Sequence, residues 1–192
     1  MSVRQKMDHK KLVYQCIKRN TAAQRELYRL FSQIMLGVCY RYTKSVADAE
    51  DVLQDGFIKV FKNLHQFKGT GDLGAWIRRI MVNTAINYLK HKSLYQYDLS
   101  FTDNSMHPVS DENPEIILNT KELSDLIRQL PTGFQTIFNM HAVEGYSHVE
   151  IGSLLGINEG TSRSQYSRAR TLLISWITKN SLDNKEGHYA RK

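Results

Sequence analysis

A run of hydroxyl, amide and guanidinium side chains near the C-terminal end of the sequence has the chemistry to contact phosphates and base edges. The residues that carry it are Thr161, Ser162, Arg163, Gln165, Tyr166 and Arg168. Arginine and glutamine can form paired hydrogen bonds with bases in the major groove, and hydroxyl groups bind phosphates. We therefore expect a recognition helix that begins near Gly160 and contacts duplex DNA. Ser162 departs from the usual pattern, because such helices commonly place an apolar residue there.

The residues before this run have the order of a helix-turn-helix motif. Ser147 and Glu150 match a capping box at the start of one helix. Gly156 suits the turn and Asn158 suits the cap of the next helix, while Gly152 is small enough to let two helices cross closely. A plain helical hairpin with a solvated basic face is the alternative. The agreement of caps, turn and polar helix favours DNA binding.

The first half of the sequence also has helical periodicity, with apolar residues three and four positions apart. A capping box at Thr21 and Gln24 predicts the start of one helix. Ser45 and Asp48 predict the start of a second, and a glycine-rich break then precedes a third that includes Trp76. The first half is therefore expected to form a helical domain.

The composition changes between residues 93 and 119, where acidic and polar residues cluster with few apolar ones. This composition is typical of a flexible acidic linker. Helical periodicity returns near Leu123 and stops near Gly145, and no alternation is long enough to build a sheet. We expect an all-α protein of two small helical domains. The expected segments are domain 10–92, linker 93–119, domain 120–179 and polar tail 180–192.

The overall composition favours an intracellular protein with a polyanionic partner. Lys and Arg number 26 against 19 Asp and Glu, an excess that suits nucleic acid or anionic lipid. The two cysteines form no CxxC pair and lie in apolar stretches, which favours reduced core residues and a cytoplasmic location. A charged start and the lack of a long apolar run argue against a signal peptide and against membrane insertion.

Several apparent motifs do not support an enzyme. Residues 69–74 match GxGxxG, but a predicted helix rather than a strand precedes them, so nucleotide binding is not expected. His141, Glu144 and His148 are close in sequence, yet Gly145 interrupts the helix and no further ligand spacing supports a metal, so they are interpreted as surface residues. No Walker A loop, nucleophile elbow or catalytic carboxylate pair occurs. We expect no enzymatic activity, metal or cofactor.

Three segments resemble sigma factors of the sigma-70 family, in particular the extracytoplasmic-function (ECF) subfamily. Residues 48–55 (DAEDVLQD) resemble the polymerase-binding motif of sigma region 2, and residues 75–89 (AWIRRIMVNTAINYL) resemble its minus-ten reading helix. Leu130-Pro131 and residues 160–170 (GTSRSQYSRAR) resemble sigma region 4. The resemblance covers about residues 12–177 and is interrupted at the linker.

The resemblance implies that the helix of residues 48–55 docks on the clamp of the largest subunit of core RNA polymerase. The residues that would contact the clamp are Asp48, Asp51, Gln54 and Asp55. Helical spacing places the three aspartates on one face, opposite the apolar stripe, where they would form a compact acidic surface. Acids near a helix start can equally complement the helix dipole, and the resemblance is what favours docking.

The resemblance also implies a reader of the opened minus-ten strand, because this family holds an extruded base in a loop. The residues concerned are Lys68, Gly69, Thr70, Arg78, Arg79, Asn83 and Asn87. Residues 68–72 would receive the extruded base, the two asparagines would face base edges, and the two arginines would steer phosphates. Trp76 is interpreted as a core residue rather than a stacking platform.

The function implied is a sigma factor that brings core polymerase to minus-ten and minus-thirty-five elements and aids promoter melting. The implied partners are the polymerase clamp, the flap of the second subunit, promoter DNA in duplex and single-stranded form, and an anti-sigma factor, with the protein a monomer on its own. The acidic linker could mimic RNA inside the polymerase or serve as an inert tether. The competing functions are a repressor that uses only its helix-turn-helix and a helical adaptor for a protein partner.

Overall fold

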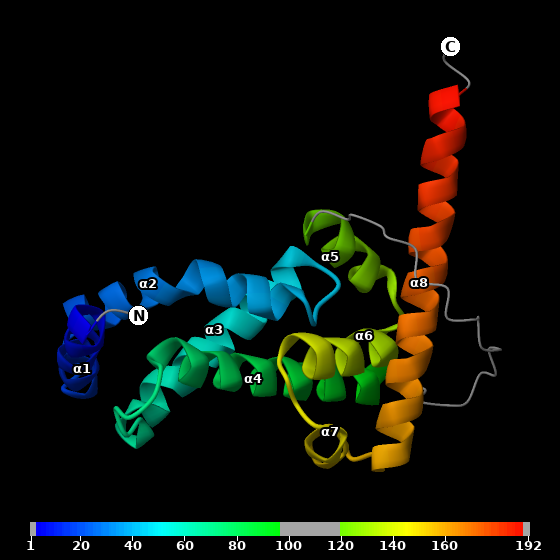
Figure 1. The fold of residues 1–192 in the computed structure, drawn as a ribbon. Coiled ribbons are helices and arrows are strands. Elements are labelled where there is room, and N and C mark those ends of the chain that lie inside the picture. Colours follow the sequence, from blue (N-terminus) through cyan, green and yellow to red (C-terminus); the bar gives the residue numbers. More distant parts are fainter. Residues whose placement is uncertain (1–2, 97–119, 190–192) are drawn as a thin grey trace. The chain divides into compact units, whose positions relative to one another are not determined.

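The described residues, 3–96 and 120–189 of this computed structural model, form helices joined by turns and loops and contain no strand. Side chains are described for residues 9–92 and 122–179. The chain divides after Tyr95 into two compact units, which we treat separately (Figure 1). The all-α prediction and the two helical domains are confirmed. None of the described helices is long and apolar enough to cross a membrane.

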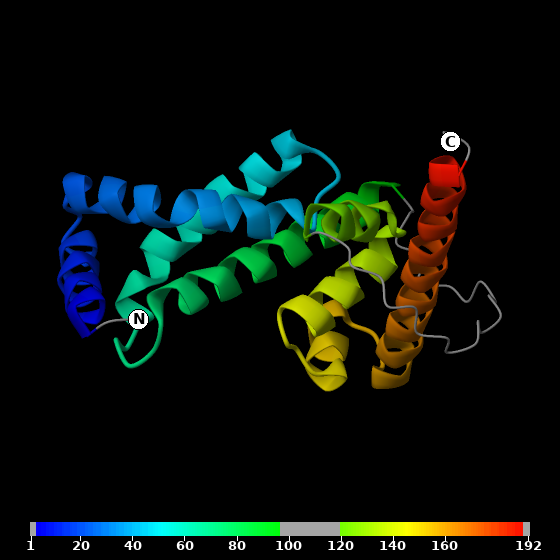
Figure 2. The same cartoon turned by 45° about the horizontal axis from the view of Figure 1, so that its top comes forward.

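Unit 1 is built from four α-helices and one short 3-10 turn within its described part. They are α1 (Val3–Ile17), α2 (Thr21–Tyr40), α3 (Val46–Asn63), η1 (Leu64–Gln66) and α4 (Leu73–Gln96). The apolar faces of α2, α3 and α4 form the core, with Leu27, Val60 and Ile77 fully buried. The Phe57 ring on α3 packs against the Tyr28 ring on α2 in a tilted arrangement, with ring centroids 4.7 Å apart. Figure 2 shows α3 crossing α2 obliquely, in agreement with the contacts between these two helices.

The start of α2 differs from its predicted capping box. Asn20, not Thr21, is the N-cap, and its side chain accepts a hydrogen bond from the backbone N–H of Ala23 at 3.0 Å. Asparagine is a stronger N-cap than threonine, which explains why the helix begins one residue after it. The turn before it passes through Arg19, whose φ is +60°. The helix α1 was not anticipated, because the predicted domain began at residue 10 in a charged segment.

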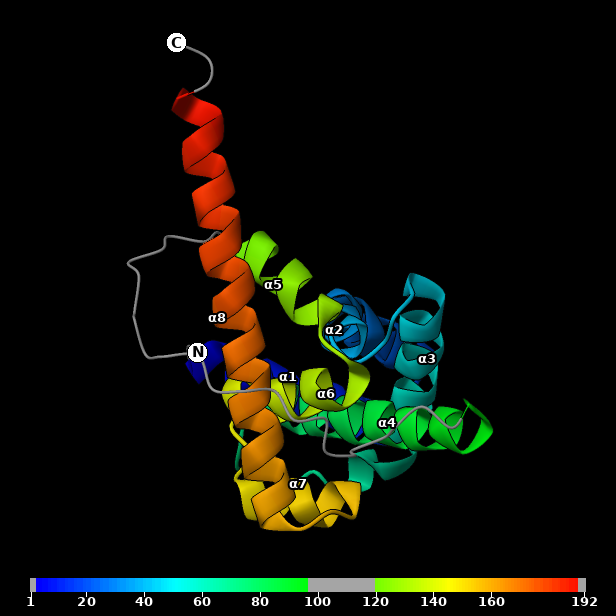
Figure 3. The same cartoon turned by 90° about the vertical axis from the view of Figure 1, so that its right-hand side faces the viewer.

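Unit 2 contains four α-helices and a π-helical turn within its described part. They are α5 (Thr120–Gln129), α6 (Thr132–Phe138), η2 (Asn139–Val143), α7 (His148–Leu155) and α8 (Glu159–Tyr189). Its core joins α5 to α8 through Leu126, Leu130, Ala169 and Leu173, with Trp176 packed at the edge. Figure 3 shows α7 crossing the beginning of α8.

The boundaries of the linker and tail shift in the structure. α4 continues to Gln96, so the first four residues of the expected linker are helical. The remainder of the expected linker, residues 97–119, lies outside the described residues. α8 continues to Tyr189 and so includes most of the segment that we expected to form a separate polar tail.

Candidate nucleic-acid interface

The corner between α7 and α8 is fixed by the local signals that the sequence contains. The Ser147 hydroxyl accepts a hydrogen bond from the Glu150 N–H at 3.2 Å, and the Glu150 carboxylate accepts one from the Ser147 N–H at 2.8 Å. Gly156 has a φ of +74°, the left-handed conformation that favours glycine at a helix end. A Cβ on Gly152 would lie 2.7 Å from the backbone oxygen of Ile157. The predicted close crossing is therefore confirmed.

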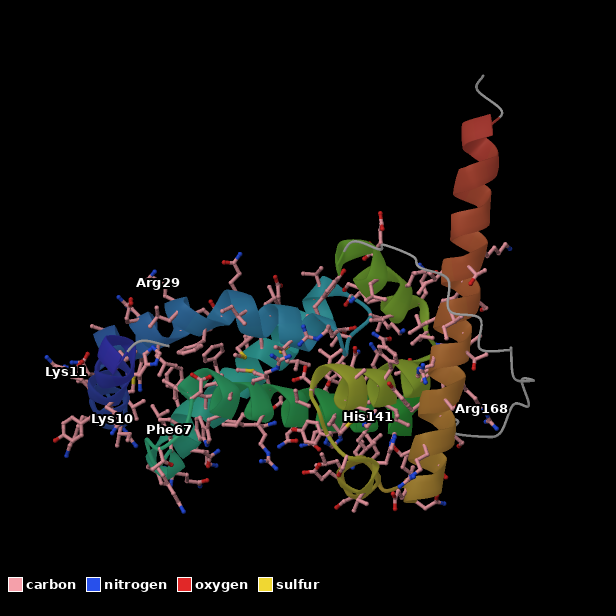
Figure 4. All side chains as sticks on the ribbon, viewed as in Figure 1. Lys10, Lys11, Arg29, Phe67, His141 and Arg168 are labelled. Atoms are coloured by element: carbon pink, nitrogen blue, oxygen red, sulfur yellow. The ribbon has the colours of Figure 1, made fainter. Side chains whose placement is uncertain are left out.

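The exposed residues of α8 present a polar surface at its first turns. The Asn158 side chain accepts a hydrogen bond from the Thr161 N–H at 2.6 Å and so caps the helix as predicted. Arg163 is exposed, and its Nε donates to the Glu159 carboxylate at 3.1 Å. Thr161 and Arg168 are half-buried, and Figure 4 shows Arg168 on the outer side of α8.

Ser162 and Gln165 require a correction. Both were expected to contact DNA, but their exposed fractions are 0% and 2%. They lie on the inner stripe of α8 with Ala169, because residues three and four apart share one helical face. Recognition helices commonly place an apolar residue at the position of Ser162, and the burial of Ser162 explains this, because the position faces the core. The Ser162 hydroxyl meets a polar partner there, Nδ1 of His148, at 2.9 Å.

Tyr166 belongs to an aromatic cluster inside unit 2. Its ring lies 4.6 Å from His141 and 5.8 Å from Phe138, measured between centroids. Tyr166 is half-buried among these rings and is held by packing. It lies on the inner side of α8, away from the exposed Arg163. The DNA contact expected of Tyr166 stays a prediction.

The two histidines of this cluster are packed rather than displayed on the surface. The rings of His141 and His148 stack with centroids 4.2 Å apart, and His141 Nδ1 donates to the Tyr146 carbonyl at 2.8 Å. Burial, His141 and Arg163 lower the pKa of His148, in that order, and Glu159 opposes them. Within the described part of the chain, no group of three or more potential ligands is arranged for a metal ion.

The acidic surface of α3 is smaller than expected. Asp51, Gln54 and Asp55 are exposed. Asp48 instead accepts hydrogen bonds from the Tyr88 hydroxyl at 2.6 Å and from Lys92 Nζ at 3.1 Å. The bond from Tyr88 is the largest cause of the lowered pKa of Asp48. This carboxylate joins α3 to α4, which corrects the expectation that it is presented to a partner.

The loop between η1 and α4 is an exposed polar turn. Lys68 and Thr70 are exposed, and Gly69 has a φ of +70°. Asp72 closes the loop, because its carboxylate accepts a hydrogen bond from the Ala75 N–H at 2.8 Å. Trp76 is half-buried and its ring lies 5.7 Å from that of Phe67, consistent with the packing role expected for it.

A line of polar side chains continues from this loop along one side of α4. Arg79, Asn83 and Asn87 are four residues apart and therefore share a face. Arg79 and Asn87 are exposed, while Asn83 is half-buried. Its Oδ1 atom is sealed from solvent and has no hydrogen-bond partner among the described residues.

Two neighbouring cations change the predicted set on α4. Arg78 is half-buried and follows a different side of the helix, about 100° from Arg79, so the structure does not group it with the asparagines. Lys90 is exposed and lies seven residues after Asn83, on the same face. Sequence reasoning missed Lys90, although its spacing from Asn83 and Asn87 was a usable signal.

Comparisons with known proteins place family regions over both units. The family described as Sigma-70 region 2 matches residues 27–94, and that described as Sigma-70, region 4 matches residues 120–173. The chain is 31% identical over 152 residues to the ECF RNA polymerase sigma-E factor of Haemophilus influenzae, covering 73% of this chain and 80% of that protein.

Two further relatives extend over more of the chain. ECF RNA polymerase sigma factor SigE of Mycolicibacterium smegmatis is 30% identical over 165 residues, covering 84% of this chain and 64% of that protein. ECF RNA polymerase sigma factor SigW of Bacillus subtilis is 27% identical over 175 residues, covering 85% and 94%. The sigma factor RpoE of Bartonella quintana, solved in complex with the anti-sigma factor NepR, aligns with a TM-score of 0.48 and 19% identity, covering 78% of this chain and 92% of that one.

Proposed function

The chain belongs to the ECF group of sigma-70 RNA polymerase sigma factors, which direct promoter-specific transcription initiation, and we propose that three groups of exposed and half-buried residues carry this function. The docking surface consists of Asp51, Gln54 and Asp55. The strand surface consists of Lys68, Gly69, Thr70, Arg79, Asn83 and Asn87. The duplex surface consists of Thr161, Arg163 and Arg168.

The docking surface is proposed to bind the polymerase clamp through its charge. Its three side chains project from α3 on the side opposite the buried Leu53 and Val60, so a partner can approach without disturbing the core. Acidic side chains in this setting steer a basic partner and fix its register more than they add affinity. Asp48 contributes indirectly, because its bonds to Tyr88 and Lys92 set α3 against α4.

The strand surface carries the proposal most directly, because an exposed loop with a left-handed glycine leads into a line of amide and guanidinium groups. Gly69 allows the backbone to approach a base without a Cβ clash. Within the part of the chain that the structure describes, Asn83 Oδ1 accepts no hydrogen bond, and leaving that acceptor unpaired costs about 1–3 kcal/mol. Rotation of its amide towards an extruded base would relieve that cost.

The duplex surface is proposed to read the minus-thirty-five element. The pair of Arg163 and Glu159 is exposed, and exposed ion pairs contribute little to stability, so Arg163 can exchange its partner for a base or phosphate. Ser162 and Gln165 support this surface from beneath by packing α8 onto α7 and the core.

The partners proposed for these surfaces are the clamp and the flap of core polymerase and promoter DNA, first as duplex and then as an opened strand. We also propose that the chain acts as a monomer inside the cell, under the control of an anti-sigma factor. A repressor using only the helix-turn-helix would need neither the docking surface nor the strand surface.

Run-off transcription with reconstituted holoenzyme tests the strand surface. Asn83→Ala is expected to reduce transcription from a closed promoter, and a template mismatched across the minus-ten element should restore it in part, because melting no longer depends on base capture. Activity equal to that of the parent on the closed promoter would refute the role of Asn83.

A pull-down with core polymerase tests the docking surface. Asp51→Lys with Asp55→Lys is expected to abolish binding while circular dichroism shows an unchanged helix content. Glu122→Lys with Asp125→Lys makes the same change in charge on exposed residues of α5 and should bind. Normal binding by the first variant would contradict the docking assignment, and a repressor would bind polymerase in neither form.

A further inference from the structure

The helix α1 lies outside the matched family region, which begins at residue 27, yet it touches the loop of the strand surface. The Lys10 side chain is closest: its Cε lies 3.6 Å from the position that a Cβ on Gly69 would occupy. Figures 1 and 2 both show α1 beside the loop that precedes α4, and Figure 4 shows Lys10 and Lys11 on the same side of unit 1 as Phe67. A ligand bound at this loop would therefore lie next to α1.

One side of α1 is cationic and aromatic. Lys10 and Tyr14 are four residues apart on α1, and Lys11 lies beside them. Lys18 follows directly after the end of α1, and its N–H donates to the Tyr14 carbonyl at 3.2 Å, so it continues the same face. All four side chains are exposed, and Tyr14 is 63% exposed. Lys18 Nζ lies 5.8 Å from the centroid of the Tyr14 ring. We call these four residues the α1 stripe.

The opposite side of α1 is fixed to the rest of unit 1. Val13 and Cys16 are buried, and the His9 ring lies 5.8 Å from Phe31 of α2. Phe31 in turn lies 3.2 Å from the position of a Cβ on Gly74, at the start of α4. The α1 stripe is therefore held in a constant position beside the loop.

The chemistry of the α1 stripe suits a single nucleic-acid strand. Among the described side chains, no carboxylate forms an ion pair with Lys10 or Lys11. Cations that follow a phosphate backbone, interleaved with an exposed aromatic ring on which a base can stack, are the two parts of a single-strand binding track. An anionic lipid surface would need a broad apolar face, whereas this stripe offers one ring between lysines.

We propose that the α1 stripe binds the opened promoter strand next to the base held by the loop, with Lys10 and Lys11 on phosphates and Tyr14 stacked on an unpaired base. This inference rests on the proposed function of the strand surface and extends it beyond the matched region. From Lys10 to Lys18 the stripe runs about 12 Å, so it can hold the strand over more than one backbone phosphate.

Holoenzyme binding to a promoter mismatched across the minus-ten element, titrated at several salt concentrations, tests the proposal. Lys10→Ala with Lys11→Ala should weaken binding by about tenfold and reduce the slope of log K against log salt by about 1.4, at about 0.7 for each single-strand phosphate contact. Arg25→Ala with Arg29→Ala is the matched control, because it removes two exposed cations from α2, where Figure 4 shows Arg29 on the other side of unit 1. The control should leave affinity and slope unchanged.

Modified DNA and two further variants of the protein locate the contact. Neutral methylphosphonates placed singly along the mismatched strand should weaken binding by the parent protein at one or two positions, and should have no further effect there on the double lysine variant. Tyr14→Phe should retain affinity, because the ring remains, while Tyr14→Leu should weaken binding by about fivefold to 150-fold, the range for the loss of one stacked base.

The outcomes separate this proposal from the function on which it rests. If Asn83→Ala weakens binding while the double lysine variant keeps the parent affinity and slope, the α1 stripe is refuted and the strand surface stands. If neither variant has an effect, the strand surface itself fails. Loss of binding to vesicles of anionic lipid by the double lysine variant, with DNA binding unchanged, would identify a membrane surface instead and overturn the proposal.

Discussion

Replacing Gly152 with alanine should destabilise the second unit, although alanine is the better helix former. The new Cβ would lie 2.7 Å from the backbone oxygen of Ile157, and this oxygen cannot rotate away as a side chain could. Overpacking of this kind costs about 1–3 kcal/mol. The gain in helix propensity from glycine to alanine is about 1 kcal/mol. Because the clash is with backbone, we expect the overpacking cost to be about 3 kcal/mol, the upper end of its range. After the gain in helix propensity is subtracted, the free energy of unfolding should fall by about 2 kcal/mol.

The same clash should also change DNA binding, because the turn closes on Gly152 itself. The N–H groups of Gly156 and Ile157 both donate to the Gly152 carbonyl, at 2.9 and 3.0 Å. A shift of that carbonyl moves the start of α8 and with it the exposed Arg163. Affinity for a minus-thirty-five duplex should therefore fall further than the unfolded fraction alone accounts for.

Urea unfolding followed by tryptophan fluorescence can isolate this effect. The chain has two tryptophans, and Trp76→Phe leaves Trp176, at the edge of the unit 2 core, as the reporter. Ser153→Ala, an exposed change in the same helix, is the control and should stay within about 0.5 kcal/mol of the parent. If Gly152→Ala unfolds with the parent's free energy and binds the duplex equally well, the close crossing is not the constraint that we infer.

Three further results are expected. Unit 2 should lose stability as the pH falls below 6.5, the ordinary pKa of histidine, because the pKa of His148 is lowered in the folded state and the unfolded chain binds the proton first. His148→Gln should flatten this pH dependence. A parent protein whose stability does not change over this pH range would refute the prediction. Tyr88→Phe should lower the unfolding free energy of unit 1 by about 1 kcal/mol in urea, because Asp48 loses its shorter hydrogen bond, and an unchanged midpoint would contradict this. Burial raises the pKa of Cys39 to about 12, so a thiol reagent should modify it only after unfolding; rapid labelling in native buffer would show that the site opens.

Local signals in the sequence were sufficient wherever a structure depends on residues a few positions apart. Ser45 and Ser147 cap α3 and α7 through backbone groups three residues on, and Gly156 ends α7 through its own backbone conformation. Each of these features is decided by short-range hydrogen bonds and sterics, so residue type and spacing reveal it. The start of α2 shows the limit of such local signals. Asn20 and the adjacent Thr21 could both cap the helix, and the stronger cap, Asn20, does so.

The sequence by itself therefore determined the helical class, the two domains, the helix-turn-helix corner and, through family resemblance, the sigma-factor assignment. The tertiary structure alone decided which polar residues are presented to a partner. Ser162 and Gln165 are buried, and Asp48 is bonded across to α4, because a polar side chain can satisfy its hydrogen bonds against a distant helix that spacing along one helix does not reveal. The same holds for Lys10 beside Gly69: 59 positions separate them in the chain, and only the packing of α1 brings the cation to the loop.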